Sequence, residues 1–226
     1  GLRDMAVIAS DSFAGLGDNV TLAGRTLDNA LGGSGTRAWA NINSANMVGN
    51  GAGQIRGSSN ARNGRVQVTG LGNHKVRTRF TFNGSYSNIC VTTLCTNGVD
   101  NGTTNAIYAL LATSGTSLRV REGVNQTWAG GADRASKTIT APSTSGYYYL
   151  ELEVNGLDVT SRLLNDDLSV YDSVSYTFAA LPTGQFCGLG FALSGNAALF
   201  DDFLVEDLEG GAAPPPQPGR ARGMWV

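Results

Sequence analysis

Apolar and polar residues alternate through the stretch 146–178, whose sequence is GYYYLELEVNGLDVTSRLLNDDLSVYDSVSYTF. In its first run, one side of an extended chain carries Tyr148, Leu150, Leu152 and Val154, and the other carries Tyr147, Tyr149, Glu151 and Glu153. A period of two is typical of a half-buried β-strand. Asn155-Gly156 suits a tight turn, and further runs follow at 157–164 and 168–178. We expect three antiparallel strands here, whose apolar face needs further strands to cover it.

The same period recurs at 75–82, which predicts a second clear strand. Val76, Thr78, Phe80 and Phe82 would face one way, and Lys75, Arg77, Arg79 and Thr81 the other. Shorter runs of strand character lie at 5–12, 47–48, 54–55, 65–69, 106–111, 117–122, 137–140, 186–193 and 197–207. The stretches 11–39, 83–104 and 125–137 are interpreted as loops. About ten to twelve short strands with frequent turns predict an all-β sandwich or barrel.

Length and composition agree with one large all-β domain or two small ones, and sandwiches of this size often form a single unit. The chain has 226 residues, and its 31 glycines argue against long helices. Charged residues make up 15% and the net charge is −2, so a basic field for nucleic acid is not expected. No apolar run approaches the roughly 20 residues that span a bilayer. The first residues, GLRDMAVIASDSF, do not resemble a signal peptide.

The cysteines leave two readings open. Cys90 and Cys95 could close a small loop as a disulfide, or they could be buried thiols, since three cysteines allow no complete pairing. Cys187 stands in an alternating apolar run and is expected in the core. Zinc is not expected, because the chain has one histidine, His74, in a predicted turn.

The end of the chain departs from the strand pattern. Residues 211–226 are rich in Pro and Gly and then become basic and aromatic. We interpret 1–210 as a sandwich domain and 211–226 as an extended docking arm, although a disordered terminus is the alternative. The residues that would contact a partner are Pro214, Pro215, Pro216, Arg220, Arg222 and Trp225.

Three stretches resemble a known superfamily. DSFAG…VTLAGR, YYYLELEVNG…VTSRLLNDDLSVYDS and GLGFAL…ALFDDFLVED look like a concanavalin A-like, laminin-G-like jelly roll. The resemblance implies two antiparallel sheets stacked face to face, with the first and last strands near each other. Lectins, carbohydrate-binding modules, glycosidases and virion proteins share this fold, so the site must decide the function.

No motif in the chain specifies a reaction. Glucanases of this fold carry Glu-x-Asp-x-x-Glu on one strand, and the acids Glu151 and Glu153 lack the third member. A Ser-His-Asp mechanism would rest on His74 alone, without a nucleophile elbow. We therefore do not expect an enzyme.

Sugar binding is the next class of function. Lectin sites combine an aromatic platform with planar polar groups, and the candidates are Trp128, Tyr147, Tyr149, Arg77 and Arg79. The same tyrosines could be ordinary cross-strand packing. The arginines could pair with nearby carboxylates or bind phosphate or sulfate.

Calcium is the cofactor that the resemblance suggests. If the first and last strands meet, as the resemblance implies, Asp11 would approach Asp201 or Asp202, and related modules hold structural calcium there. The alternative, which we favour, is a set of turn or edge carboxylates without metal.

The leading functional hypothesis is a structural protein. Richness in Gly, Ala, Ser, Thr and Asn and the basic-aromatic ending resemble a bacteriophage head-decoration or fibre protein on the virion surface. Its expected partners are the major capsid protein, further copies of itself and surface glycans, without nucleic acid or membrane. A carbohydrate-binding module or lectin, secreted or extracellular, is second, and a glycoside hydrolase or lyase third.

Overall fold

The computed structural model describes residues 6–40, 47–57, 63–82, 88–98, 102–191 and 198–208. These residues form fourteen strands and no helix, which confirms the all-β prediction. The strands are β1 (Ala6–Asp11), β2 (Met47–Gly49), β3 (Ile55–Gly57), β4 (Asn63–Gln67), β5 (His74–Phe82), β6 (Ile89–Cys95), β7 (Thr104–Ala112), β8 (Ser117–Gln126), β9 (Ala132–Thr138), β10 (Tyr147–Asn155), β11 (Asp158–Asn165), β12 (Val170–Thr177), β13 (Phe186–Phe191) and β14 (Ala198–Asp207).

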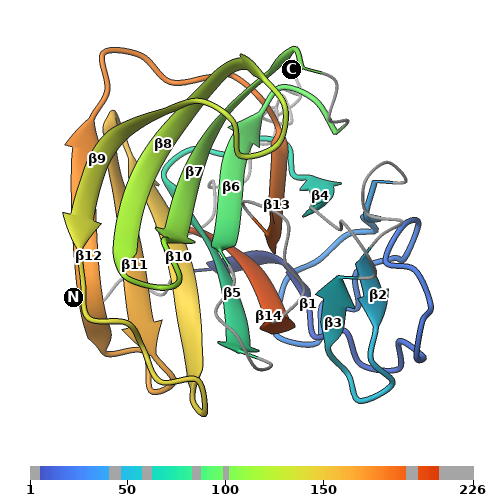
Figure 1. Cartoon of the computed structure of the whole chain (residues 1–226). Helices are drawn as coiled ribbons and strands as arrows, with labels where there is room; N and C mark the ends of the chain where they lie inside the picture. Colours follow the sequence, from blue (N-terminus) through green and yellow to red (C-terminus); the bar gives the residue numbers. More distant parts are fainter. Residues whose placement is uncertain are drawn as a thin grey trace, which may run out of the picture.

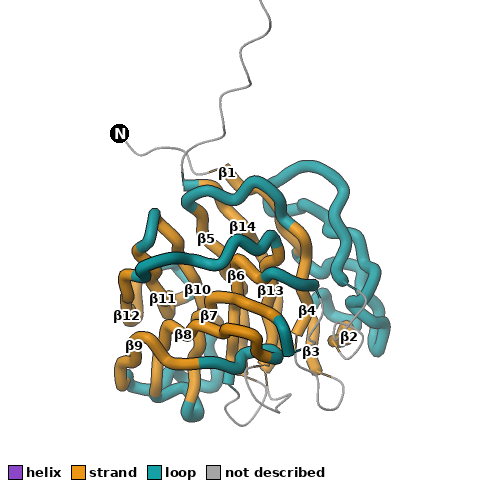
Figure 2. Tube along the Cα trace, turned by 90° about the horizontal axis from the view of Figure 1, so that it is seen from above, coloured by secondary structure: helices purple, strands orange, loops and turns teal. Residues whose placement is uncertain are grey.

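The strands form two antiparallel sheets that stack face to face. An eight-stranded sheet has the order β12-β11-β10-β5-β14-β3-β2, with β1 also paired to β14. A six-stranded sheet has the order β4-β13-β6-β7-β8-β9 and lies in front of the larger one in Figure 1. Figure 2 shows the two layers from the end of the sandwich. The first and last described strands are neighbours, as a jelly roll requires.

The period-two runs place the core between the sheets. In β5 every second residue from His74 to Phe82 is buried, and the residues between are half-buried. β10 runs antiparallel to β5, with Leu150 opposite Thr78 and Leu152 opposite Val76. Paired residues share a sheet face, so both strands turn their apolar side chains inward.

The segment 83–104 was predicted as a loop, and this is wrong for β6. All seven residues of Ile89–Cys95 are buried, so the strand has no polar face and no alternation. Its outer side is covered by a second small core in which Trp128 packs edge-on against Tyr108, with ring centroids 5.5 Å apart. A strand buried on both faces cannot be recognised by periodicity. The three thiols are free and buried, so Cys90 and Cys95 are not bridged.

The loop predicted at 125–137 also contains a strand. β9 pairs with β8 at the edge of the six-stranded sheet, and its side chains are almost all exposed. It buries no apolar face, so it left no pattern in the sequence.

Segment 12–39 is irregular, as predicted, and Trp39 fixes it to the sandwich. The Trp39 ring is 1% exposed and lies 5.0 Å from the Phe203 ring, measured between centroids. The predicted arm at 211–226 lies outside the described residues. In the described part of the chain, no helix has the length and hydropathy of a membrane span.

Candidate functional site

The outer face of the eight-stranded sheet carries most of the predicted ligand residues. On β10, Tyr147, Tyr149 and Glu151 point away from the core because Tyr148 and Leu150 point into it. Across the ladder, Tyr149 lies opposite Arg79 and Glu151 opposite Arg77. The outward aromatic and acidic side chains of β10 therefore lie beside the outward cationic side chains of β5. We call this surface, formed by β5, β10, β11 and β14, the outer face.

One half of the outer face is a network of ion pairs. Glu151 is 2% exposed, and its carboxylate lies 2.9 Å from Arg162 Nη1 and 3.6 Å from Lys75 Nζ. Arg162 Nη1 also bonds Glu153 at 2.7 Å, and Arg77 bonds Glu206 at 3.2 Å. Each acid in this half has a cationic partner, so these groups hold each other in place.

The ion pairs of this network do not suit Glu151 and Glu153 to act as the catalytic acids of a glycosidase. Burial acts to raise the pKa of Glu153, but the hydrogen bond and charge of Arg162 outweigh it and hold that pKa below its ordinary value. A glycosidase acid needs the opposite, a raised pKa that keeps its proton at neutral pH. Glu151 and Glu153 instead both form ion pairs with Arg162 and Lys75.

The other half of the outer face centres on Arg79 and the two tyrosines. Arg79 donates two bonds to Asp166, at 2.8 and 2.9 Å, and one to Asp201. Its guanidinium carbon lies 3.9 Å from the centroid of the Tyr147 ring, and that of Arg77 lies 5.7 Å from the Tyr149 ring. These contacts fix the rings and raise the pKa of Arg79 through the Asp166 bond despite partial burial. The alternative of a phosphate or sulfate site is weakened, because Arg77 and Arg79 are both paired.

A bulge in β14 adds two acids beside Arg79. The β5–β14 register shifts between Phe200 and Phe203, which are both core residues, so Asp201 and Asp202 together stand opposite Arg79. Burial and the charge of Asp201 raise the pKa of Asp202 to about 6. A half-buried carboxylate without a cation of its own is thus placed next to Tyr149, whose own pKa is raised by burial and by Asp202.

Trp128 does not belong to this surface, and its prediction as a sugar platform is wrong. The ring is 2% exposed, and its Nε1 donates a hydrogen bond of 2.8 Å to the Phe191 carbonyl. The Arg65 guanidinium lies 5.2 Å from its centroid. Trp128 covers the outer side of β6 and β7, where no sugar can reach its faces.

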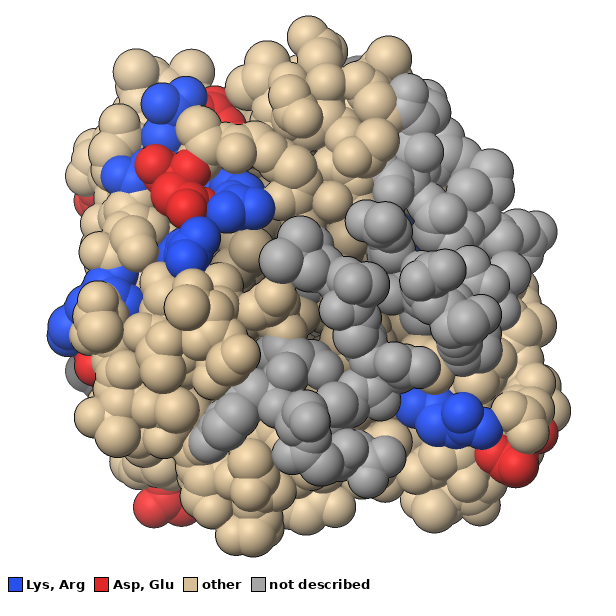
Figure 3. Space-filling model, viewed as in Figure 1, with Lys and Arg blue, Asp and Glu red and all other residues tan. Residues whose placement is uncertain are grey.

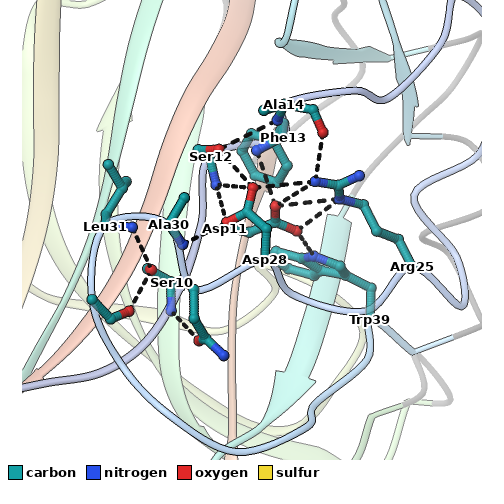
Figure 4. A network of polar contacts seen from close by, with 12 residues as sticks. Ser10, Asp11, Ser12, Phe13, Ala14, Arg25, Asp28, Ala30, Leu31 and Trp39 are labelled. Carbon is teal, nitrogen blue, oxygen red and sulfur yellow. Dashed lines mark hydrogen bonds and ion pairs between the residues drawn. The ribbon is translucent and has the colours of Figure 1, made fainter.

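The prediction that Asp11 is a calcium ligand is also wrong. Asp11 pairs with Phe203 of β14 and shares its inward direction, whereas Asp202 points to the opposite face. Figure 4 shows the carboxylate held by Arg25, the Trp39 indole at 2.8 Å and the Phe13 amide at 2.9 Å. Its two oxygens are thus occupied by donors, which does not fit a cation. The described residues also contain no group of three or more His, Cys, Asp and Glu side chains that could hold a metal.

A second charged surface was not predicted. Charged side chains gather over β8 and β9 on the face seen in Figure 3, where Arg119 and Arg121 both bond Asp133, at 2.9 and 2.6 Å. On the outer face, the partners Arg162, Asp166 and Glu206 were missed as well. They lie far along the chain from Arg77 and Arg79, so only the strand register brings them together. Of the five residues predicted to bind a ligand, all except Trp128 therefore lie on the outer face. Asp201 and Asp202 lie on the same face.

Comparisons with solved structures place the fold in a class of proteins. No protein-family model matches the chain, and no curated protein matches it. The structures it resembles are jelly-roll domains of lectins and carbohydrate-binding modules. One is the carbohydrate-binding module CBM66 from Bacillus subtilis, with a TM-score of 0.52 and 12% identity over 89% of this chain and 97% of that one.

A second set of similar structures is the exoplasmic/lumenal domain of VIP36. Its metal-free form has a TM-score of 0.57 and 13% identity over 90% of this chain and 93% of that one. Its form with Ca²⁺ and Man₃GlcNAc has a TM-score of 0.54 and 16% identity over 75% and 84%. At such identities the similarity shows the fold, and function has to come from the residues of this chain.

Proposed function

We propose that this protein is a non-catalytic carbohydrate-binding domain whose outer face holds the sugar. One observation carries the proposal: Tyr147, Tyr149, Arg79 and Asp202 come together on one outward sheet face. Aromatic rings pack on the C–H faces of sugar rings, and carboxylate and guanidinium groups bond hydroxyls. The similar structures include two forms of the VIP36 exoplasmic/lumenal domain, one bound to Ca²⁺ and Man₃GlcNAc and one bound to Ca²⁺ and Man₂.

The contacts between these residues suit binding more than chemistry. The rings are held by arginines, and the arginines are held by Asp166, Asp201 and Glu206. Side chains fixed before the ligand arrives lose little conformational freedom on binding. Asp202 is the remaining acceptor, and its half-buried charge is placed where a sugar hydroxyl could bond it.

A glycan array with matched variants tests this function. We expect reproducible binding by the unaltered protein and loss of the signal in Tyr149→Ala and in Tyr147→Ala. Tyr176→Ala is the control, because Tyr176 is 37% exposed but pairs with the core residue Val159 and so does not lie on the outer face. A blank array for the unaltered protein, or equal loss in the control, would contradict the proposal.

We also propose that the domain is displayed on a virion as a decoration or fibre protein. The support lies in the sequence: low charge, many small residues, the resemblance to such proteins and the basic-aromatic ending. The major capsid protein and further copies of this chain are the proposed partners. Deletion of 214–226 should leave a soluble domain that no longer assembles on capsid shells. Assembly equal to that of the full chain would show that the arm is dispensable.

A further inference from the structure

A cleft at one end of the sandwich is separate from the outer face. The connection between β12 and β13 crosses this end, at the top of Figure 1. Two hollows of about 430 and 330 Å³ adjoin there, because Thr183, Gly184 and Gln185 line both. We call them together the end cleft. Its size falls in the range of sites for small ligands, which is about 300–1,000 Å³.

Among the residues that the structure describes, those lining the end cleft include no charged side chain. Its amides and hydroxyls are Asn73, Gln67, Gln185, Thr96 and Thr183, and its larger apolar members are Leu71, Leu94, Val154, Leu181, Pro182 and Phe186. Gln67, Thr183 and Gln185 are exposed residues, and Phe186 is half-buried. Gln67 Nε2 donates to Gln185 Oε1 at 3.4 Å, which leaves an amide oxygen on Gln67 and an amide nitrogen on Gln185 for a ligand.

The walls of the cleft are fixed by the strands around them. Gly184 lies directly on β6, where an added Cβ would come within 2.0 Å of the Cys95 carbonyl carbon. The Val68 amide donates to the Gln185 carbonyl at 2.7 Å, and the Gly156 amide donates to Asn73 Oδ1 at 2.7 Å. The cleft therefore exists before any ligand binds, which lowers the cost of ordering.

Charge decides which ligand fits. A carboxylate or sulfate moved into this cleft would lose water without gaining a cationic partner, which is unfavourable. Hydroxyl groups can bond amides and hydroxyls, while an apolar sugar face can pack on Phe186 and Leu181. We infer that the end cleft binds a neutral oligosaccharide, at a site distinct from the ion-paired outer face. The inference rests on the proposed carbohydrate-binding function and adds a second site and a ligand class to it.

Mapping by NMR separates the two sites. Amide shifts of the full chain would be followed during titration with neutral oligosaccharides of glucose, mannose, galactose and fructose, and with uronic acid and sulfated oligosaccharides. We expect a neutral member to shift amides in 70–73 and 181–186, and the anionic members to leave these unchanged. Gln185→Ala and Thr183→Ala, at exposed positions, should each weaken that binding by about tenfold, which corresponds to one or two lost hydrogen bonds.

The controls are Tyr149→Ala and Asp202→Asn on the outer face, which should leave the shifts at 181–186 intact. Amide shifts that a sugar induces only at 147–153 and 201–206, with Gln185→Ala binding as well as the parent, would show that the end cleft does not bind the sugar. The proposed function would then still stand. Binding of anionic sugars at 181–186 in place of neutral ones would overturn the ligand class. No shift with any sugar would overturn both this inference and the proposed function.

Discussion

At the scale of the residue, Asp11 on β1 and Asp202 on the neighbouring strand β14 have different surroundings. Asp11 is fully buried and bonded by Arg25, Trp39 and Phe13, whereas Asp202 on the other sheet face has a raised pKa of about 6. The sequence predicted that the strands carrying these acids would meet, and this is confirmed. It could not show which face each acid takes, because the bulge at Asp201 and Asp202 changes the alternation locally.

Replacing Asp11 should be costly. In Asp11→Ala the Trp39 indole and the Phe13 amide lose the acceptor that they have in Asp11, and Arg25 keeps only the Ala14 carbonyl and Asp28. Breaking a buried ion pair typically costs about 3–5 kcal/mol. Urea unfolding at pH 7 measures the free energy of unfolding. Asp18→Ala is the control, because the Asp18 side chain is 60% exposed and lies 3.3 Å from Arg56, so its loss should cost about 1 kcal/mol or less. An equal effect of the two changes would contradict the role given to Asp11.

Asp202 should instead lower stability at neutral pH. Its pKa of about 6 in the folded protein exceeds the ordinary value of 3.8, so the folded state binds the proton more tightly than the unfolded state. This group's contribution is therefore most favourable below pH 3.8 and is lost as the pH rises through about 6. Asp202→Asn should raise the free energy of unfolding at pH 7.5 by about 1 kcal/mol, since solvent screening reduces the full shift, and should change little at pH 3.5. Urea melts at both pH values check this, and a gain that is the same at both would argue against it.

At the scale of the element, the alternating strands were all predicted, and the two strands that the sequence interpretation placed in loops, β6 and most of β9, do not alternate. Strands β5, β10 and β11 have one face in the core and one face towards solvent, so their apolar residues recur at every second position. β6 is buried on both sides and β9 on neither, so neither shows the period. Trp128, one of the three aromatic residues predicted for a sugar site, instead covers the outer side of β6. Its position depends on how the connection after β8 folds back, which no local pattern reports.

Gly184 is the element-scale contact that can be tested. Gly184→Ala should separate the 181–185 connection from β6, because the new Cβ would overlap Cys95 backbone atoms, and overpacking of this kind costs about 1–3 kcal/mol. Gly146→Ala is the control, since its Cβ would meet only side-chain atoms of Tyr148, at 3.1 Å, which can shift. Thermal unfolding followed by circular dichroism gives both values. A Gly184→Ala protein as stable as the control would show that the connection is not held on β6.

At the scale of the whole molecule, the fold supplies two candidate surfaces of different chemistry. The outer face is ion-paired and aromatic, and the end cleft is uncharged and lined by amides, hydroxyls and apolar side chains. The jelly-roll class was predicted from three stretches of sequence and agrees with the similar solved structures. The outer face was predicted in part, because alternation places Arg77, Arg79, Tyr147 and Tyr149 outward. Its acids Asp166, in the turn after β11, and Asp201, Asp202 and Glu206, on β14, are brought to the face by the topology. The end cleft likewise consists of residues that lie far apart in the chain.

The central claim is that this domain binds carbohydrate on the outer face without altering it. Isothermal titration with the oligosaccharide that gives the strongest array signal, followed by product analysis of the same sample, tests it most directly. We predict saturable heat for the unaltered protein, at least about tenfold weaker binding for Tyr149→Ala, unchanged binding for Tyr176→Ala, and an oligosaccharide of unchanged length. Absence of binding heat, binding that Tyr149→Ala leaves intact, or a shortened oligosaccharide would contradict the claim.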